Sequence, residues 1–226
     1  VMVYDFDNFS PGSLLAVIAK YGVTSFCAPP TVYRYFIKKD MRRYDLSSLE
    51  HITTAGEALN PKVFRAVQEQ TGLDIMEGFG QTESVLMLAA LENTEPRVGS
   101  MGKPSPLYDV RILSDDGTFA APGEVGEIVV VPRGNKQPGI FAGYCGDDEL
   151  YKKVWRGGVY HTGDTAYCDN DGYFFYVGRA DDLIKTSGFR VGPFEIENIL
   201  MEHPAVLECA ITGVPDKKRG QAIKAT

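Results

Sequence analysis

The stretch "GYFFYVGRADDLIKTSGFRVGPFEIE", residues 172–197, decides how the fold is read. Aromatic residues open it, two arginines and two adjacent aspartates follow, and a helix-like run closes it. The alternating set Tyr173, Phe175 and Val177 predicts a strand with these side chains on its core face. A core strand does not need so many charges, and a surface loop does not need so many aromatics. We therefore expect the passage to join two domains near residues 179–182.

The residues before this stretch have the pattern of antiparallel strands. "YDVRIL" at 108–113 and "GEIVVV" at 126–131 are short apolar runs, and "GYFFYVG" follows at 172–178. The segments "SDDGTFAAPGEVG" and "DNDG" between them consist of turn-forming residues. This region is predicted to be a small antiparallel β-barrel.

The first hundred residues alternate between strands and helices. Ser10 is expected to cap a helix that ends at Gly22, and Asn60 one that ends at Gly72. The runs "VTSFCA", "HITTAG" and "LDIMEGFG" predict strands at residues 23–28, 51–56 and 73–80. The alternation indicates an α/β layer with a mostly parallel sheet.

After the opening stretch, the sequence predicts a helix followed by one strand. The helix is "PFEIENILMEH" at 193–203, and the strand is "AVLECAITGVP" at 205–215. We expect an α/β part over residues 1–102, a barrel-like part over 103–180 and the start of a C-terminal domain over 181–226.

Composition excludes several classes of protein. The 226 residues carry a net charge of −7, and no basic cluster points to nucleic acid as a partner. No run of eighteen apolar residues predicts a membrane span. The four cysteines form no C-x-x-C pair, which predicts reduced thiols in a cytoplasmic protein, or in an organelle matrix if eukaryotic. The three histidines are isolated in sequence, which argues against a metal site built from a cluster of side chains.

Two glycine-containing segments follow predicted strands of the α/β part: "TTAGEALNP" at 53–61 and "EGFGQTES" at 77–84. Ligands of open α/β sheets bind outside the carboxyl ends of strands. Thr82 offers a hydroxyl for phosphate and Glu83 a carboxylate for Mg²⁺. Each segment taken alone is equally well read as an ordinary turn. "GFGQTE" lacks the third glycine of a dinucleotide fingerprint, so an oxidoreductase is not favoured.

Asp164, in "HTGD", follows Gly163 at a predicted tight turn. A carboxylate there can accept hydrogen bonds from both hydroxyls of a ribose, although aspartate is also common in turns. Arg179 and Arg190 are planar forks suited to phosphate or carboxylate, and a salt-bridged linker is the structural alternative.

Together, in this order and spacing, these segments resemble the adenylate-forming superfamily, which contains acyl-CoA synthetases, luciferases and peptide-synthetase adenylation domains. The matching elements are "AGEALN", "GFGQTES", "HTGD", "GRADDLIKTSGFRVGPFEIE" and "VPDKKRGQAIKA". They cover essentially the whole chain. The segments "FCAPPTVYR" at 26–34 and "EGFGQTES" look most like those of medium-chain acyl-CoA synthetases. The resemblance implies part of a large α/β domain with its β-barrel, followed by the start of an α+β lid.

The resemblance also implies the chemistry. Such enzymes join a carboxylic acid, here expected to be medium-chain or aromatic, to ATP, and coenzyme A then displaces AMP. The residues expected at the nucleotide are Gly56, Glu57, Ala58, Glu77, Gly78, Phe79, Gly80, Gln81, Thr82, Asp164 and Arg179. Catalytic roles are expected for Thr82, for Glu83, which would bind Mg²⁺, and for Arg190. Asp181 matches the family's hinge. Ser187, Gly188, Phe189 and Arg219 are expected to bind coenzyme A.

The chain departs from the family pattern in two places. It contains no Ser/Thr/Gly-rich phosphate loop ending in lysine, and Lys224 does not match the position of the family's catalytic lysine. We therefore expect an internal fragment of such a ligase that is inactive alone. The alternative is a non-catalytic nucleotide-binding or interaction module. The sequence does not predict which acid is used or the oligomeric state.

Overall fold

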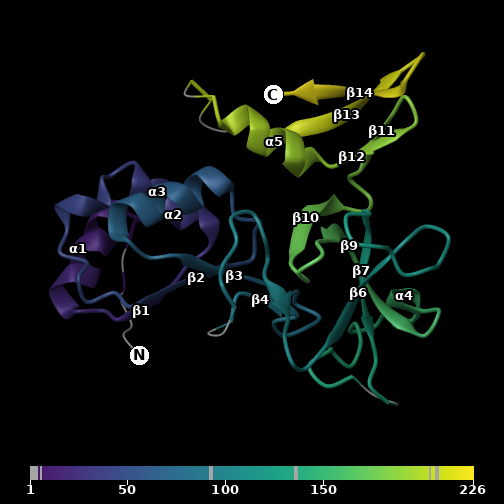
Figure 1. Ribbon diagram of the computed structural model, residues 1–226, viewed down its shortest axis with the longest axis horizontal. Coiled ribbons are helices and arrows are strands. Elements are labelled where there is room, and N and C mark those ends of the chain that lie inside the picture. Colours follow the sequence, from purple (N-terminus) through teal and green to yellow (C-terminus); the bar gives the residue numbers. More distant parts are fainter. Residues whose placement is uncertain (1–4, 6, 92–93, 135–136, 204, 207–208) are drawn as a thin grey trace. The chain divides into compact units, whose positions relative to one another are not determined.

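The structure is a computed structural model that describes residues 5, 7–91, 94–134, 137–203, 205–206 and 209–226. The chain divides into two compact units, Val1–Met76 and Glu77–Thr226 (Figure 1). The division expected from sequence, at residues 102 and 180, remains a prediction.

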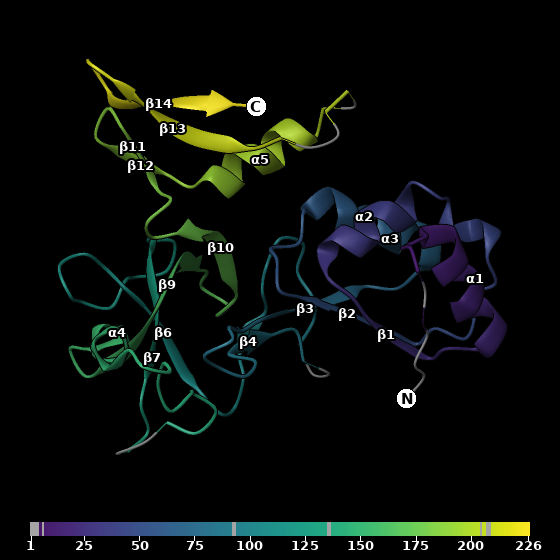
Figure 2. The ribbon, with the colours of Figure 1, turned by 180° about the vertical axis from the view of Figure 1, so that it is seen from behind.

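The first unit packs helices against a pair of parallel strands. In chain order its elements are α1 (Pro11–Tyr21), β1 (Ser25–Cys27), α2 (Pro30–Ile37), the 3-10 helix η1 (Met41–Arg43), β2 (His51–Ala55) and α3 (Pro61–Thr71). Strands β1 and β2 pair in parallel, as predicted. Figures 1 and 2 show α2 and α3 side by side, next to these strands.

The predicted helix caps are confirmed. The Ser10 side chain accepts a hydrogen bond from the backbone of Ser13, and the Asn60 side chain accepts one from Lys62. Gly22 and Gly72 end their helices in the left-handed conformation, which glycine adopts without steric cost. Leucine, isoleucine, valine and aromatic side chains from all three helices and from β2 form the core of this unit.

Strand β3 (Ile75–Phe79) begins in the first unit and continues in the second. It pairs antiparallel with β4 (Leu88–Ala89), which pairs antiparallel with β5 (Lys103–Pro104). The sequence predicted a mostly parallel sheet here and missed β4 and β5. Strands of two residues have no periodicity, and their pairing depends on partners distant in sequence.

The region predicted to be an antiparallel barrel contains a five-stranded sheet, in which four strands follow the order β10-β9-β7-β6 and β8 pairs with β9. Its elements are β6 (Asp109–Leu113), β7 (Gly126–Val131), α4 (Asp148–Val154), β8 (Trp155–Arg156), β9 (Val159–Cys168) and β10 (Phe174–Arg179). One face of the sheet packs into a core that includes Ile128, Tyr160 and Phe174.

The core face predicted for β10 is confirmed only in part. Phe174 and Tyr176 contribute to the core of the sheet, whereas the Phe175 ring stacks on Tyr167 with their centroids 4.9 Å apart. Tyr173 and Val177 are nevertheless buried, so both faces of this strand are covered. A strand covered on both sides gives no reliable alternation from which to choose its core face.

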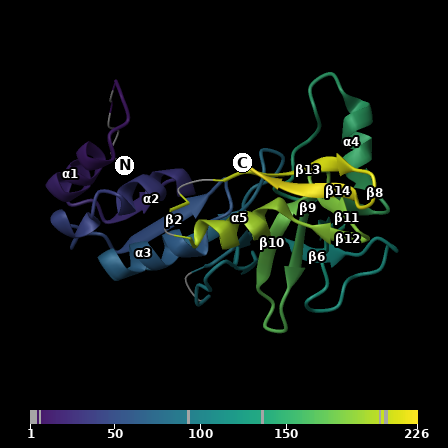
Figure 3. The same cartoon turned by 90° about the horizontal axis from the view of Figure 1, so that it is seen from above.

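The C-terminal elements form an antiparallel sheet in the order β12-β11-β14-β13 with one helix beside it (Figure 3). They are β11 (Ile184–Thr186), β12 (Phe189–Val191), α5 (Pro193–Met201), β13 (Ile211–Asp216) and β14 (Gly220–Ala225). The predicted helix is confirmed. The strand predicted from residue 205 begins only at Ile211, and residues 207 and 208 lie outside the described part.

Two sequence expectations concern composition. Within the described part of the chain, no helix is both long and apolar enough to cross a bilayer. All four cysteines are free thiols, as predicted.

Candidate functional site

A bulge in β9 presents the Asp164 carboxylate. On the facing strand β7, Val129 pairs with His161 and Glu127 with Thr165, so the residues between His161 and Thr165 lie opposite Ile128 alone. Gly163 adopts φ 74°, the left-handed conformation that such bulges require. The predicted tight turn is thus wrong: the segment is an irregularity inside a ten-residue strand, and sequence alone does not reveal the partner strand that defines a bulge.

Glu127, on the neighbouring strand β7, accepts hydrogen bonds from this bulge. One carboxylate oxygen accepts a hydrogen bond from the backbone N–H of Gly163 at 2.9 Å. The other accepts from His161 Nδ1 at 2.7 Å and from Arg156 at 3.1 Å. His161 is buried. The bulge that carries Asp164 is therefore fixed by charge-assisted hydrogen bonds.

Asp164 is only 5% exposed, yet its carboxylate has several partners. Gln81 Nε2 donates to Oδ2 at 2.6 Å, the Tyr176 hydroxyl donates to Oδ1 at 3.3 Å, and Arg179 Nη1 lies 3.5 Å from Oδ1. Burial raises the pKa of Asp164, and the neighbouring Arg179 charge opposes that rise. The structure thus brings together Gln81, Asp164 and Arg179, three residues predicted to bind nucleotide.

Glu83 lies in the loop after β3 and is half-buried. The Tyr144 hydroxyl donates a hydrogen bond to Glu83 Oε1 at 2.9 Å. Among the residues that the structure describes, no cluster of three His, Cys, Asp or Glu side chains could hold a metal. Mg²⁺ commonly takes one or two protein carboxylates and completes its shell with water and substrate phosphates, so a single oriented Glu83 carboxylate fits this ion.

The other residues of β3 and of the loop after it that were predicted to bind nucleotide differ in their environments. Glu77 is buried, Phe79 packs against the core of the antiparallel sheet, and Thr82 is exposed. A Cβ atom at Gly78 would lie 2.5 Å from the Leu86 side chain, and one at Gly80 would lie 3.0 Å from the Val85 carbonyl oxygen. A side chain at Gly78 would have to displace Leu86, and one at Gly80 would approach backbone closely.

Gly56, Glu57 and Ala58 follow β2 in the first unit. The Glu57 carboxylate lies 3.0 Å from the Arg34 guanidinium and accepts a hydrogen bond from the Thr31 hydroxyl. Gly56 has φ 93°, and a Cβ there would meet nothing within 4 Å. The segment is a glycine turn after a strand, as the sequence predicts.

Arg179 connects the Asp164 site to the segment predicted to be a hinge. Its guanidinium donates a hydrogen bond to the Thr162 carbonyl at 3.2 Å and lies 3.4 Å from Asp181. The Asp181 side chain is 76% exposed, and it directly precedes the C-terminal elements.

The four residues predicted to bind coenzyme A lie together at one end of the C-terminal sheet. Ser187 and Gly188 form the two-residue turn between β11 and β12, with φ 51° and 86°, the pattern of a type I′ hairpin. The Ser187 N–H donates to the Arg219 carbonyl at 2.9 Å. Phe189 is 71% exposed beside this turn. The grouping of Ser187, Gly188, Phe189 and Arg219 was not evident from spacing, because Arg219 is distant in sequence.

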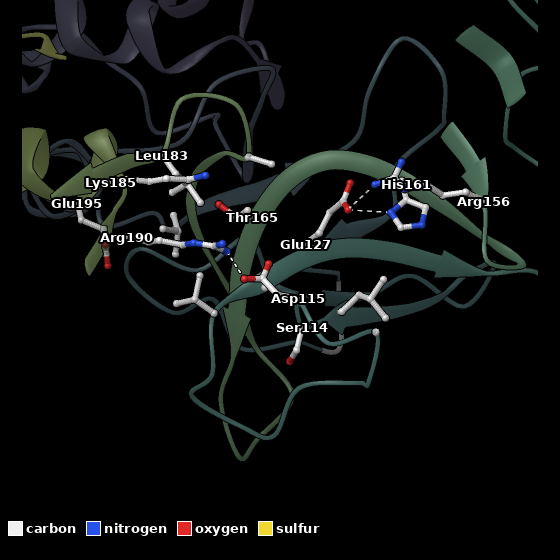
Figure 4. Close-up of a pocket in the computed structure, with 16 residues that line it drawn as sticks. Ser114, Asp115, Glu127, Arg156, His161, Thr165, Leu183, Lys185, Arg190 and Glu195 are labelled. Atoms are coloured by element: carbon white, nitrogen blue, oxygen red, sulfur yellow. Dashed lines mark hydrogen bonds and ion pairs between the residues drawn. The ribbon is translucent and has the colours of Figure 1, made fainter. Parts of the chain in front are cut away.

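Arg190 faces a different part of the second unit. Figure 4 shows its guanidinium paired with Asp115, from the loop after β6. The pair borders a cavity of about 690 Å³ that Glu127 and Lys185 also line. In this structure Arg190 contacts Asp115 and not one of the residues predicted to bind nucleotide.

Sequence reasoning missed three tyrosines of the site: Tyr144, Tyr160 and Tyr176. Tyr160 directly precedes "HTGD", and Tyr176 is one residue from the set predicted to face the core, so both positions carried a local signal. Tyr144 carried none, because its partner Glu83 is 61 residues away.

Comparison with known proteins gives a consistent assignment. The model of the AMP-binding enzyme family matches residues 1–145, and the model of the AMP-binding enzyme C-terminal domain matches residues 195–226. Acyl-coenzyme A synthetase ACSM3, mitochondrial, of Homo sapiens is 44% identical over 225 residues, which are all of this chain and 38% of the relative. 4-hydroxybutyrate–CoA ligase 1 of Metallosphaera sedula is 47% identical over 213 residues, 93% of this chain and 37% of the relative.

A solved structure agrees with these relatives. ATP-bound MatB from Rhodopseudomonas palustris superposes with a TM-score of 0.87 and 27% sequence identity, over 98% of this chain and 43% of that one. The α/β class and the adenylate-forming fold predicted from sequence are confirmed. The chain spans well under half the length of each of these proteins. It belongs to the AMP-binding enzyme family.

Proposed function

We propose that this chain is part of an AMP-forming acyl-CoA ligase, which activates a carboxylic acid with ATP and transfers the acyl group to coenzyme A. The observation that carries the proposal is the buried Asp164 carboxylate on its bulge, held by Gln81 and flanked by Arg179. A fixed, charged acceptor of this kind suits the two hydroxyls of a ribose. The family assignment and the ATP named for the similar structure support the same ligand.

The residues around Asp164 have complementary proposed roles. Asp164 accepts hydrogen bonds from the ribose hydroxyls, and Arg179 supports the ribose and the phosphates. Thr82, exposed in the loop, contacts phosphate. Glu83, oriented by Tyr144, holds Mg²⁺ together with the phosphates of ATP. Bound there, Mg²⁺ would neutralise phosphate charge, which helps two anionic reactants to meet.

The roles proposed for the remaining residues follow the family pattern. The backbone at Gly56, Glu57 and Ala58 and the Glu77–Gly80 segment are proposed to contact the adenosine part of the nucleotide. Asp181 is proposed as the hinge of the C-terminal domain. The Ser187–Phe189 hairpin turn and Arg219 are proposed to bind coenzyme A, and their clustering supports a shared ligand.

Arg190 is proposed to reach the α-phosphate or the substrate carboxylate once its contact with Asp115 is released. The acid itself is proposed to be medium-chain or aromatic. The two relatives carry the names of a mitochondrial acyl-CoA synthetase and a 4-hydroxybutyrate–CoA ligase, and only the second name specifies an acid. A cytoplasmic or organelle-matrix location is likewise a proposal.

Calorimetric titration with a non-hydrolysable acyl-adenylate mimic tests the nucleotide site. We expect saturable binding that Asp164→Ala weakens by about 1–3 kcal/mol, roughly 5- to 150-fold in Kd, because the ribose hydroxyls lose their charged acceptor. Asp109→Ala is the matched control, since Asp109 is a carboxylate of the same sheet that pairs with the exposed Arg111. Equal binding by the wild type and Asp164→Ala would refute the role of Asp164.

Turnover by this chain alone is a separate question. We expect acid-dependent ATP–pyrophosphate exchange at or near background, because the sequence contains neither the phosphate loop nor the lysine of the family. Exchange at rates typical of enzymes, about 1–1000 per second, would contradict that expectation. Nucleotide binding without exchange, in a longer chain that carries both motifs, would favour the non-catalytic module.

A further inference from the structure

A buried tyrosine donates a hydrogen bond to Gln81, the amide that contacts Asp164. Tyr160, on β9, is 1% exposed, and its hydroxyl donates a hydrogen bond to Gln81 Oε1 at 3.0 Å. Gln81 Nε2 in turn donates to Asp164 Oδ2 at 2.6 Å and to the Thr162 carbonyl at 2.9 Å. Tyr160, Gln81 and Asp164 thus form a continuous chain of hydrogen bonds.

The chemistry of these groups allows one orientation of the Gln81 amide. A carboxylate and a carbonyl only accept hydrogen bonds, so the amide NH₂ must face Asp164 and Thr162. The amide oxygen then faces Tyr160, whose hydroxyl donates to it. If the amide were flipped, its oxygen would face two acceptors and its NH₂ would face the phenol. The two acceptors set this orientation, and the Tyr160 hydroxyl stabilises it by donating to the amide oxygen.

The surroundings of Tyr160 hold its hydroxyl in place. Its ring lies in the core of the sheet, with its centroid 5.4 Å from that of Trp155. Its backbone pairs with Val130 on one side and with Trp155 on the other. A donor on a packed strand positions its partner more accurately than one on a loop. Burial also raises the pKa of Tyr160, so the phenol keeps its proton at neutral pH.

We propose that Tyr160 is a positioning residue of the nucleotide site: it orients the Gln81 amide, which holds the Asp164 carboxylate ready for the ribose hydroxyls. Tyr160 itself contacts no ligand. The proposal rests on the proposed function only in naming ribose as the group that Asp164 receives. The effect of Tyr160 on Asp164 through Gln81 is inferred from their hydrogen bonds alone.

The test compares Tyr160→Phe with Tyr173→Phe in the 226-residue chain. Tyr173 is a matched control, because it is also buried and its hydroxyl donates one hydrogen bond, to the Glu95 carbonyl at 2.8 Å, away from Asp164. The ¹³C carboxyl resonance of Asp164, assigned with Asp164→Asn, is followed against pH. The side-chain amide resonances of Gln81 are recorded on the same samples.

In Tyr160→Phe we expect the Asp164 titration midpoint to move to higher pH, because a donor to the ionised carboxylate is loosened. The Gln81 amide resonances should shift or broaden, and Tyr173→Phe should change neither observable. The proposal would be overturned if folded Tyr160→Phe had the same Asp164 titration midpoint and the same Gln81 amide resonances as the wild type. If Tyr160→Phe does not fold, Gln81→Met serves instead: an unchanged Asp164 midpoint in that variant would overturn the proposal equally.

A titration with AMP separates this proposal from the proposed function. If the wild-type chain binds AMP, Tyr160→Phe should bind it about 2- to 10-fold more weakly, the loss expected for one hydrogen bond. Equal affinity would overturn the positioning role. If the wild-type chain does not bind AMP, the nucleotide role of Asp164 fails for this chain. The NMR titration, which needs no nucleotide, still decides whether Tyr160 holds Asp164 through Gln81.

Discussion

Replacement of Glu127 by alanine should destabilise the second unit because it removes the anchor of the β9 bulge. The Glu127 carboxylate accepts hydrogen bonds from the Gly163 N–H at 2.9 Å and from His161 Nδ1 at 2.7 Å. The His161 side chain is 6% exposed and that of Glu127 18% exposed. A water molecule from the cavity that Glu127 lines would be only a neutral acceptor, so both donors lose their charge-assisted hydrogen bonds.

The size of the loss follows from these contacts. A hydrogen bond to a charged group contributes about 1.5–3 kcal/mol, which gives about 3–6 kcal/mol for the two shielded donors. The Arg156 side chain is 57% exposed, so its ion pair with Glu127 adds about 1 kcal/mol at most. Glu127→Gln keeps one acceptor in place and should lose about half as much. Glu149→Ala should lose almost nothing, because its ion pair with Lys152 is fully at the surface.

The assay is urea unfolding followed by tryptophan fluorescence. Trp155 is the single tryptophan of the chain and packs against Tyr160, so it reports on the second unit. The free energy of unfolding should rank wild type and Glu149→Ala highest, then Glu127→Gln, then Glu127→Ala. Unfolding free energies for Glu127→Ala and Glu149→Ala that agree within about 0.5 kcal/mol would refute the assignment of Glu127 as the anchor.

Two further predictions concern stability. Burial raises the pKa of Asp164 above its ordinary value, so the folded chain binds that proton more tightly than the unfolded chain. The free energy of unfolding therefore falls as pH rises through the folded pKa. Asp164→Asn should be more stable than wild type in urea at pH 7, by a margin that shrinks as pH falls towards about 4. A margin that grows on acidification would show that the sign is wrong. At Gly102, with φ 89°, an added Cβ would lie 2.0 Å from the Ala89 carbonyl carbon, so Gly102→Ala should cost about 3 kcal/mol or more. Gly117→Ala, with φ 82° and nothing within 4 Å, should cost only the backbone strain of about 1–2 kcal/mol, and equal melting temperatures for the two variants would contradict the close approach.

Local features of the fold could be read from the sequence because local chemistry determines them. Ser10 and Asn60 cap helices with their own side chains, and Gly22 ends a helix by adopting a conformation that other residues rarely take. The apolar runs that form β6 and β7 are long enough to show strand character. The boundaries of these elements depend on contacts within a few residues, and a single sequence contains that information.

Features that depend on distant partners could not be read in the same way. Gln81 meets Asp164 across 83 residues and Tyr160 across 79, so no spacing rule links them. The β9 bulge exists only relative to β7, and without that strand the segment resembles a turn. The family resemblance named Gln81 and Asp164 as separate nucleotide-binding residues. Only the structure shows that they contact each other and that the buried Tyr160 hydroxyl donates to the Gln81 amide oxygen.

Under the roles proposed for Arg179 and Asp181, Arg179 would link nucleotide binding to movement of the C-terminal domain. Its guanidinium lies 3.5 Å from Asp164 and 3.4 Å from Asp181, the proposed hinge. Because Asp181 is mostly exposed, its pull on Arg179 is weak and screened by salt, whereas the buried Asp164 carboxylate attracts the same guanidinium with little screening. A phosphate that engages Arg179 would therefore weaken the contact with Asp181 first. Occupation of the site would then free the hinge while leaving the Asp164 bulge intact, as expected if the domain moves only after the nucleotide is bound.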